Sequence, residues 1–167
     1  MIIYRKATFD DAEHIHKLCN YYASIGLMLP RSRNSIYENL RDYIVDVEDD
    51  KVLGCGALHF VWDRLAEIRS LAIDAEHKKR GIGKNIVELL EKEGIERGVK
   101  MFFTLTYQPG FFIKCGYTET AKESLPQKVW KECVHCPQYP YCNEIAFIKK
   151  TPDYVSHAIL PEAVQEK

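Results

Sequence analysis

A basic, glycine-containing stretch at residues 77–84 is the part of the sequence whose residue types point most directly to chemistry. It lies between a predicted strand and a predicted long helix. The first turn of a helix leaves amide N–H groups without partners, and glycine allows a ligand to approach the backbone. Together with the helix dipole and the surrounding charges, these donors favour binding of a diphosphate. A solvated basic turn, with glycine kept for packing, is the alternative interpretation. The residues concerned are Lys78, Lys79, Arg80, Gly81, Ile82, Gly83 and Lys84.

Two common nucleotide-binding patterns are absent from this stretch. It lacks the Gly-Lys-Ser/Thr spacing of a P-loop, and it does not follow the Gly-x-Gly-x-x-Gly pattern of dinucleotide-binding folds. The sequence therefore indicates an anion site of a different type.

Composition limits the classes of partner. The 167 residues include 23 Lys plus Arg and 24 Asp plus Glu, so no overall basic field for nucleic acid exists. No apolar run approaches the length of about 18 residues that a membrane span needs. The N-terminus resembles a strand and not a secretory signal, so we expect a cytoplasmic protein. With 46% hydrophobic residues, the chain can bury one core of ordinary size.

Hydrophobic periodicity predicts a mixed α/β fold with an antiparallel N-terminal part and helices on both faces of the sheet. In the helix after Thr8, a stripe is formed by Ile15, Leu18, Cys19 and Tyr22. In the long helix, the predicted core residues are Ile86, Leu89, Leu90 and Ile95. Strands are predicted at 2–8, 43–47, 52–62, 65–73, 101–106 and 143–149, and helices after Thr8 and at about 35–41, 82–97 and 109–115. We expect one domain over residues 1–150 and a C-terminal tail over 151–167.

The segment Ser70–Asp74, followed by residues 78–83, resembles the acetyl-coenzyme A signature of the GNAT acetyltransferase superfamily, Gln/Arg-x-x-Gly-x-Gly/Ala. Lys78 stands at its first position and keeps the positive charge. The resemblance implies that the fourth strand splays from the fifth, with the pantetheine arm between them like an added strand. Members commonly dimerise, so a homodimer is compatible with it. The implied coenzyme contacts are Leu71, Ala72, Ile73, the residues from Lys78 to Lys84, and Phe112.

A narrower resemblance is to the acetyltransferase domain of N-acetylglutamate synthases. The similar segments are 26–33, 53–59, 105–106 running into 111–112, 116–117 and 125–128. Longer bacterial synthases carry an amino-acid-kinase domain ahead of this one. We expect a short, stand-alone form that lacks the control by arginine through that domain.

The resemblance also implies a catalytic arrangement. Glu67 matches the position of the general base, which removes a proton from the acceptor amine, directly or through a water. An ordinary carboxylate on the strand is the alternative. Many members protonate the leaving thiolate with a Tyr, but Phe112 occupies that position here, as it does in the synthase branch. Tyr107 is a possible substitute donor, or the thiolate leaves unprotonated. The backbone N–H of Leu71 or Ala72 is the expected oxyanion donor.

An amino dicarboxylic acceptor needs cations, and three arginines are candidates. Arg31 and Arg33 lie in the loop that the family folds over the acceptor site, and Arg64 stands where the synthases carry a substrate-binding Lys. Arginine can hold a carboxylate with two hydrogen bonds. The alternative is that all three are solvated. At Tyr107, where synthases often have an Arg, the chain departs from the pattern.

A cysteine cluster lies apart from these residues. Cys133, Cys136 and Cys142 follow a Cys-x2-Cys-x5-Cys spacing with His135 inside it. Three thiolates and a fourth ligand would suit structural zinc, but a second Cys-x2-Cys pair is missing. Free thiols or a disulfide in this Pro-rich loop are the favoured interpretation.

The sequence therefore predicts an N-acetyltransferase that moves acetyl from acetyl-CoA to a small amine, with the α-amino group of L-glutamate, as in arginine biosynthesis, as the leading acceptor. The alternatives are acetylation of a protein N-terminus or lysine, acetylation of another small amine, and a non-catalytic sensor of acyl-CoA. Neither nucleic acid nor a membrane is an expected partner.

Overall fold

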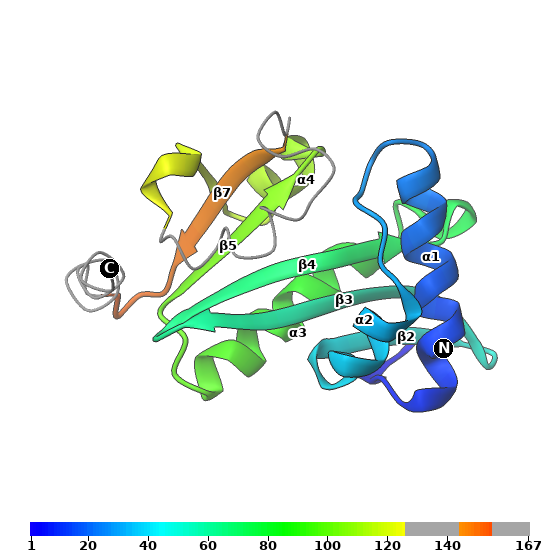
Figure 1. Ribbon diagram of the computed structural model, residues 1–167. Coiled ribbons are helices and arrows are strands. Elements are labelled where there is room, and N and C mark those ends of the chain that lie inside the picture. Colours follow the sequence, from blue (N-terminus) through cyan, green and yellow to red (C-terminus); the bar gives the residue numbers. More distant parts are fainter. Residues whose placement is uncertain (126–143, 155–167) are drawn as a thin grey trace. The chain divides into compact units, whose positions relative to one another are not determined.

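The computed structural model describes residues 1–125 and 144–154 (Figure 1). The helices are α1 (Ala12–Ser24), α2 (Arg33–Glu38), α3 (Ile82–Glu96) and α4 (Pro109–Lys114), with short 3-10 turns at Phe9–Asp11, Leu40–Asp42, Ala75–His77 and Lys122–Ser124. The strands are β1 (Ile3–Lys6), β2 (Tyr43–Glu48), β3 (Lys51–Trp62), β4 (Leu65–Ile73), β5 (Met101–Thr106), β6 (Thr118–Thr120) and β7 (Ile145–Lys150). None of the helices in these ranges has the length and apolar character needed to cross a bilayer.

The strands form one mixed sheet in the order β1-β2-β3-β4-β5-β7-β6. β1, β2 and β3 pair antiparallel, and so do β5, β7 and β6. β4 and β5 pair in parallel, Leu65 with Met101 through Glu67 with Phe103. This pairing ends at Glu67 although both strands continue, in line with the expected splay. The predicted mixed α/β class is confirmed.

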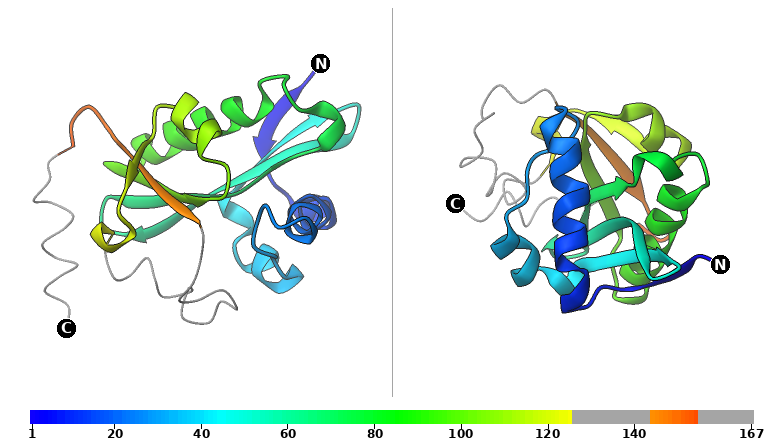
Figure 2. Two further views of the ribbon diagram at one scale, coloured as in Figure 1. Left: turned by 90° about the horizontal axis from the view of Figure 1, so that it is seen from above. Right: turned by 90° about the vertical axis from the view of Figure 1, so that its right-hand side faces the viewer.

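The chain divides into two compact units, Met1–His59 with Ile68–Glu93 and Phe60–Glu67 with Gly94–Lys167. In the first unit, α1 and α2 lie on one face of the strands and α3 on the other (Figures 1 and 2). The predicted stripe of α1 is confirmed, because Ile15, Cys19 and Tyr22 are buried and Leu18 packs against the same cluster. The cluster also includes Ile36, Leu40, Tyr43, Val45, Cys55 and Ala57.

The second unit has its own core, formed by Leu65, Met101, Phe103, Leu125 and Ala146. The short strand β6 pairs with β7 at its edge. The sequence prediction missed β6, because three residues reading Thr-Glu-Thr carry too little periodicity to indicate a strand. Of the predicted tail, residues 151–154 are described, and the amide of Thr151 donates to the carbonyl of Lys100 at 2.9 Å.

One core residue of α3 was predicted wrongly. Ile86 and Leu90 are buried, but Ile95 is 52% exposed. The buried face continues from Leu90 by one helical turn to Gly94, where an added Cβ would lie 2.6 Å from the ring of Phe102. Ile95 follows about 100° further around the helix, so its side chain points to solvent.

Candidate active site

The junction between β4 and α3 is built by backbone conformation. After β4 ends, the carboxylate of Asp74 accepts from the amide of Glu76 at 2.9 Å and lies 3.2 Å from Nδ1 of His77. The chain then passes through Lys79 (φ 68°) and Gly81 (φ 79°) before α3 starts at Ile82. The amide of Asn85 donates to the carbonyl of Gly81 at 3.1 Å. The earlier amides of the first turn have no intrahelical acceptor and are available to an anion.

The space at this turn is open. A Cβ added at Gly81 would have no heavy atom within 4 Å. Exposed cations surround the same amides, at Lys78, Lys79, Arg80 and Lys84. Backbone donors with surrounding lysine and arginine suit a diphosphate, so the residues present fit the coenzyme group that the sequence predicts.

Two of these cations also have contacts within the protein. Nη2 of Arg80 lies 2.8 Å from Oε2 of Glu48, on β2, and this contact lowers the pKa of the Glu48 carboxyl. Nζ of Lys78 lies 4.9 Å from the ring centroid of Tyr22, on α1. A bound diphosphate would compete with Glu48 for Arg80.

The strand before the turn is irregular at Ser70, which has φ 56° within β4. Its carbonyl accepts from the thiols of Cys19 and Cys55 at 3.9 and 3.4 Å, and its hydroxyl accepts from Tyr43 at 3.2 Å. Burial raises the pKa of the Tyr43 phenol, so this hydroxyl stays protonated and can donate. The phenol of Tyr22 donates to the carbonyl of Ile73. These contacts fix the segment that carries the predicted oxyanion donors, the amides of Leu71 and Ala72.

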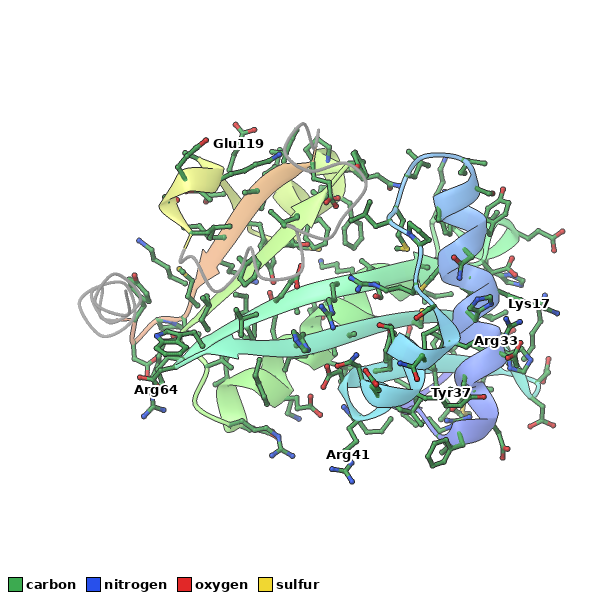
Figure 3. All side chains as sticks on the ribbon, viewed as in Figure 1. Lys17, Arg33, Tyr37, Arg41, Arg64 and Glu119 are labelled. Atoms are coloured by element: carbon green, nitrogen blue, oxygen red, sulfur yellow. The ribbon has the colours of Figure 1, made fainter. Side chains whose placement is uncertain are left out.

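The loop arginines of the first unit differ from each other. Arg33 is exposed and forms an ion pair with Glu13 of α1, with Nε 2.7 Å from Oε1 (Figure 3). Arg31 is half-buried. The pKa of the Cys19 thiol is lowered, chiefly by its hydrogen bond with Cys55 and further by Arg31. Arg33 is thus held at the surface of α1, whereas Arg31 is the more buried of the two.

Arg64 belongs to the second unit and forms the turn between β3 and β4 with φ 61° (Figure 3). Its Nη1 donates to the carbonyl of Gly98 at 3.3 Å, and its Nε lies 3.5 Å from Asp63. A Cβ at Gly98 would lie 2.5 Å from Nη1 of Arg64. The guanidinium therefore braces the connection between α3 and β5, and its role in acceptor binding stays a prediction.

The predicted catalytic residues of the second unit lie on and after the paired strands. Glu67 is half-buried on β4, opposite Phe103 of β5. Tyr107 is half-buried and follows the end of β5. Phe112 is 5% exposed and packs edge to face against Phe111 and Tyr117, with centroids 5.1 and 5.3 Å away. Phe112 is therefore part of an aromatic cluster in which a phenol would be buried.

Sequence reasoning missed buried charged residues, among them one arginine and one aspartate on strands of the sheet. Arg69 is only 8% exposed on β4, and Asp46 is fully buried on β2. Burying a charge is costly unless it is paired, so such residues need a partner or a ligand. The available signal was a charged residue inside an apolar strand, Ile68-Arg69-Ser70 in one case and Val45-Asp46-Val47 in the other.

The zinc prediction concerns Cys133, Cys136 and Cys142, which lie outside the described residues. Within residues 1–125 and 144–154, no group of three or more His, Cys, Asp or Glu side chains could hold a metal ion. In the same ranges Cys19, Cys55 and Cys115 are thiols that form no disulfide.

Comparison with known proteins agrees with the fold. The model of the acetyltransferase (GNAT) family matches residues 9–117. The chain belongs to this family and is a GNAT N-acetyltransferase.

Two relatives are similar to this chain over most of its length. An uncharacterized N-acetyltransferase, CT2212, from Chlorobaculum tepidum is 43% identical over 145 residues, which are 87% of this chain and 94% of that protein. An amino-acid acetyltransferase from Mycobacterium tuberculosis is 32% identical over 133 residues, which are 78% of this chain and 76% of that protein.

Solved structures extend the comparison. The crystal structure of Rv2747 from Mycobacterium tuberculosis, in complex with CoA and NLQ, superposes with a TM-score of 0.77 and 27% identity, covering 89% of this chain and 99% of that one. N-acetylglutamate synthase from Neisseria gonorrhoeae, complexed with coenzyme A and N-acetyl-glutamate, gives a TM-score of 0.81 at 21% identity and supports the fold alone. This chain covers 35% of that synthase.

Proposed function

We propose that the protein transfers the acetyl group of acetyl-CoA to the α-amino group of L-glutamate or a close amino-acid analogue. The observation that carries the proposal is the 32% identity to an amino-acid acetyltransferase that extends over most of both chains. The basic turn before α3 supports the coenzyme part of the proposal, because its free amides and cations suit the diphosphate of CoA.

The proposed reaction begins with loss of a proton from the acceptor ammonium group. Glu67 accepts this proton, directly or through a water, and the free amine then attacks the thioester carbonyl. The amide of Leu71 or Ala72 donates to the oxyanion that forms. The C–S bond then breaks, and the thiolate of CoA leaves either unprotonated or with a proton from Tyr107.

Arginines supply the proposed contacts with the acceptor carboxylates. Arg31 is the better placed of the two loop arginines, because Arg33 is engaged by Glu13 at the surface. Arg69 is a further candidate, because it is a buried cation two residues beyond Glu67 on the same strand. Alternate residues of a regular strand point to one face, as Glu67 and Arg69 would. Ser70, the residue after Arg69, departs from regular strand geometry.

Mass-spectrometric detection of acetylated product tests the proposal. The protein is incubated with acetyl-CoA and with separate amino acids, polyamines and peptides that carry free N-termini or lysines. We expect product with glutamate or its close analogues and none with peptides. A dye that detects thiol release is unsuitable, because the chain has six cysteines of its own.

Other outcomes would replace the proposal. Acetylation of peptides would assign the protein to the N-terminal or lysine acetyltransferases. Acetylation of polyamines alone would retain acetyl transfer and remove the amino-acid acceptor. Binding of acetyl-CoA without product from any amine would indicate an acyl-CoA sensor.

A further inference from the structure

The carboxylate of Asp46 is buried without a hydrogen-bond partner. Both of its oxygens are inaccessible and unpaired within the described part of the chain, and the residue is 0% exposed. Asp11, also buried, shows the usual solution: its oxygens accept from Arg5 at 2.7 and 3.0 Å and from the amide of Thr8 at 2.7 Å. A native protein keeps very few unsatisfied buried groups, so Asp46 calls for an explanation.

The position of Asp46 connects it to the β4–α3 turn. On β2 it pairs with Gly54 of β3 and with Tyr4 of β1. A Cβ built at Gly54 would lie 2.5 Å from Oδ1 of Asp46, 2.7 Å from Cδ1 of Ile73 and 3.2 Å from Cγ2 of Ile82. Gly54 thus leaves room for the carboxylate beside the last residue of β4 and the first residue of α3. Asp46 lies on the buried side of the turn to which we assign the diphosphate.

The groups around Asp46 shift the pKa of its carboxyl in opposite directions. Burial raises the pKa of Asp46 to about 6, and Glu48 on the same strand adds to the rise. Its own backbone amide, Arg80 and His77 act in the opposite direction. The other titratable groups nearby are Cys55 on β3 and Tyr4 on β1, whose phenol accepts from Asn85 of α3 at 3.0 Å. None of them forms a hydrogen bond with the Asp46 carboxylate.

We propose that Asp46 is a proton-accepting positioning residue beneath the coenzyme turn, so that binding of the CoA diphosphate is accompanied by uptake of a proton from solvent. This inference rests on the proposed coenzyme site. An anion at the start of α3 disfavours a second negative charge behind the same amides. Arg80 is also drawn towards the phosphates and away from Asp46. The carboxylate then accepts one proton and becomes a neutral acid, and no other bond forms or breaks.

The pH dependence follows from linkage. Below about pH 6 the carboxyl is already protonated, so the coenzyme binds without proton uptake and with its highest affinity. As the pH rises, ionised Asp46 must be neutralised on binding, so the affinity falls until the pKa of the bound state is passed. Between pH 6 and 8 we expect the dissociation constant to rise by about threefold or more.

Isothermal titration calorimetry measures this proton directly. Dephospho-CoA is the first probe, because it keeps the diphosphate and lacks the 3′-phosphate, whose own second pKa of about 6 would add protons to the balance. Titration of the full-length protein at pH 7, in phosphate-free buffers of small and large ionisation enthalpy, should give an uptake between about 0.3 and 0.9 proton. CoA itself is the second probe.

Asp46→Asn is the decisive variant, since it keeps the shape and removes the titration. It should bind dephospho-CoA without proton uptake and with an affinity that does not change between pH 6 and 8. His77→Gln is the matched control, because it removes another ionisable side chain beside the same turn. It should keep the uptake. Circular dichroism checks that each variant is folded, and if Asp46→Asn is not, the pH series of wild type and His77→Gln decides.

The outcomes are distinct. Uptake that persists in Asp46→Asn, or that disappears in His77→Gln, would overturn the proposal and assign the proton elsewhere. Binding without any uptake in the wild type would overturn it as well while leaving the coenzyme site intact. Failure of both dephospho-CoA and CoA to bind would instead remove the proposed function on which the inference rests.

Discussion

The basic turn before α3, to which we assign the coenzyme (the coenzyme turn), and the arginines that we propose for the acceptor differ in kind. The turn is one continuous segment, Lys78 to Lys84, and its donors are backbone amides set by the start of α3. The arginines are separate side chains with separate partners. Arg33 pairs with Glu13, Arg64 contacts Gly98, and Arg31 is half-buried. Recognition by backbone is local and follows from the sequence, whereas recognition by side chains depends on which partners the fold supplies.

The largest predicted effect is on the turnover rate, and it should leave coenzyme binding unaffected. Glu67→Gln should lower the turnover rate at neutral pH by about 100-fold or more, because the acceptor ammonium loses its base. Coenzyme binding should be nearly unchanged. Product formation is followed by mass spectrometry and binding by calorimetry. A turnover rate equal to that of the wild type would remove Glu67 as the base.

Asp46→Asn tests how much the buried carboxylate beside the coenzyme turn lowers the stability of the protein. A carboxyl whose pKa is raised to about 6 in the folded state binds more protons there than when unfolded. The loss of folding stability that Asp46 causes is therefore absent at low pH. It grows as the pH rises from about 4 to 6 and reaches its full size above that. At pH 8 the variant should be more stable than wild type by on the order of 2 kcal/mol.

Urea denaturation at pH 8 and at pH 4.5 measures this difference. The gain should be much smaller at the lower pH. An equal gain at both values would show that shape, and not ionisation, separates Asp from Asn at this position.

Arg31→Ala and Arg33→Ala sharpen the contrast within the acceptor loop. Arg31→Ala should raise the KM for glutamate by about tenfold, since a charged hydrogen bond to a carboxylate is lost. Arg33→Ala should change it by less than about threefold, because Arg33 is exposed and already paired with Glu13. Neither change should alter the KM for acetyl-CoA. The reverse ranking would place Arg33 at the acceptor.

Gly81→Ala probes the backbone of the coenzyme turn, and its expected effect is smaller than that of Arg31→Ala. The added methyl has no neighbour within 4 Å, so the change acts only through φ 79°, which costs an L-residue about 1 kcal/mol. The KM for acetyl-CoA should rise by about fivefold. Gly26→Ala is the control, with φ 77° and equally open space at the end of α1. If both variants behave alike, the effect lies in overall stability and not in the turn.

Much of the fold follows from the sequence because its signals are local. The strand 101–106 and the helix starting at Pro109 have the predicted positions, and the stripe of Ile15, Cys19 and Tyr22 is buried as predicted. The prediction for Ile95 was wrong because the helical spacing of apolar residues does not indicate where along α3 the packing against the core ends. For the site, residue type indicated the candidates. Arg69 and Asp46 were missed, because the type of a residue does not say whether its charge is buried.

The sequence alone indicated the class of protein and a basic, glycine-containing turn at the start of α3, since glycines, basic residues and the start of a helix act over a few neighbouring positions. Only the tertiary structure decided that Arg33 is held by Glu13, that Arg64 braces the connection before β5, and that Asp46 is buried without a partner behind the turn. The physical reason is that the energy of a charge depends on its solvation and on partners far along the chain, which only folding brings together.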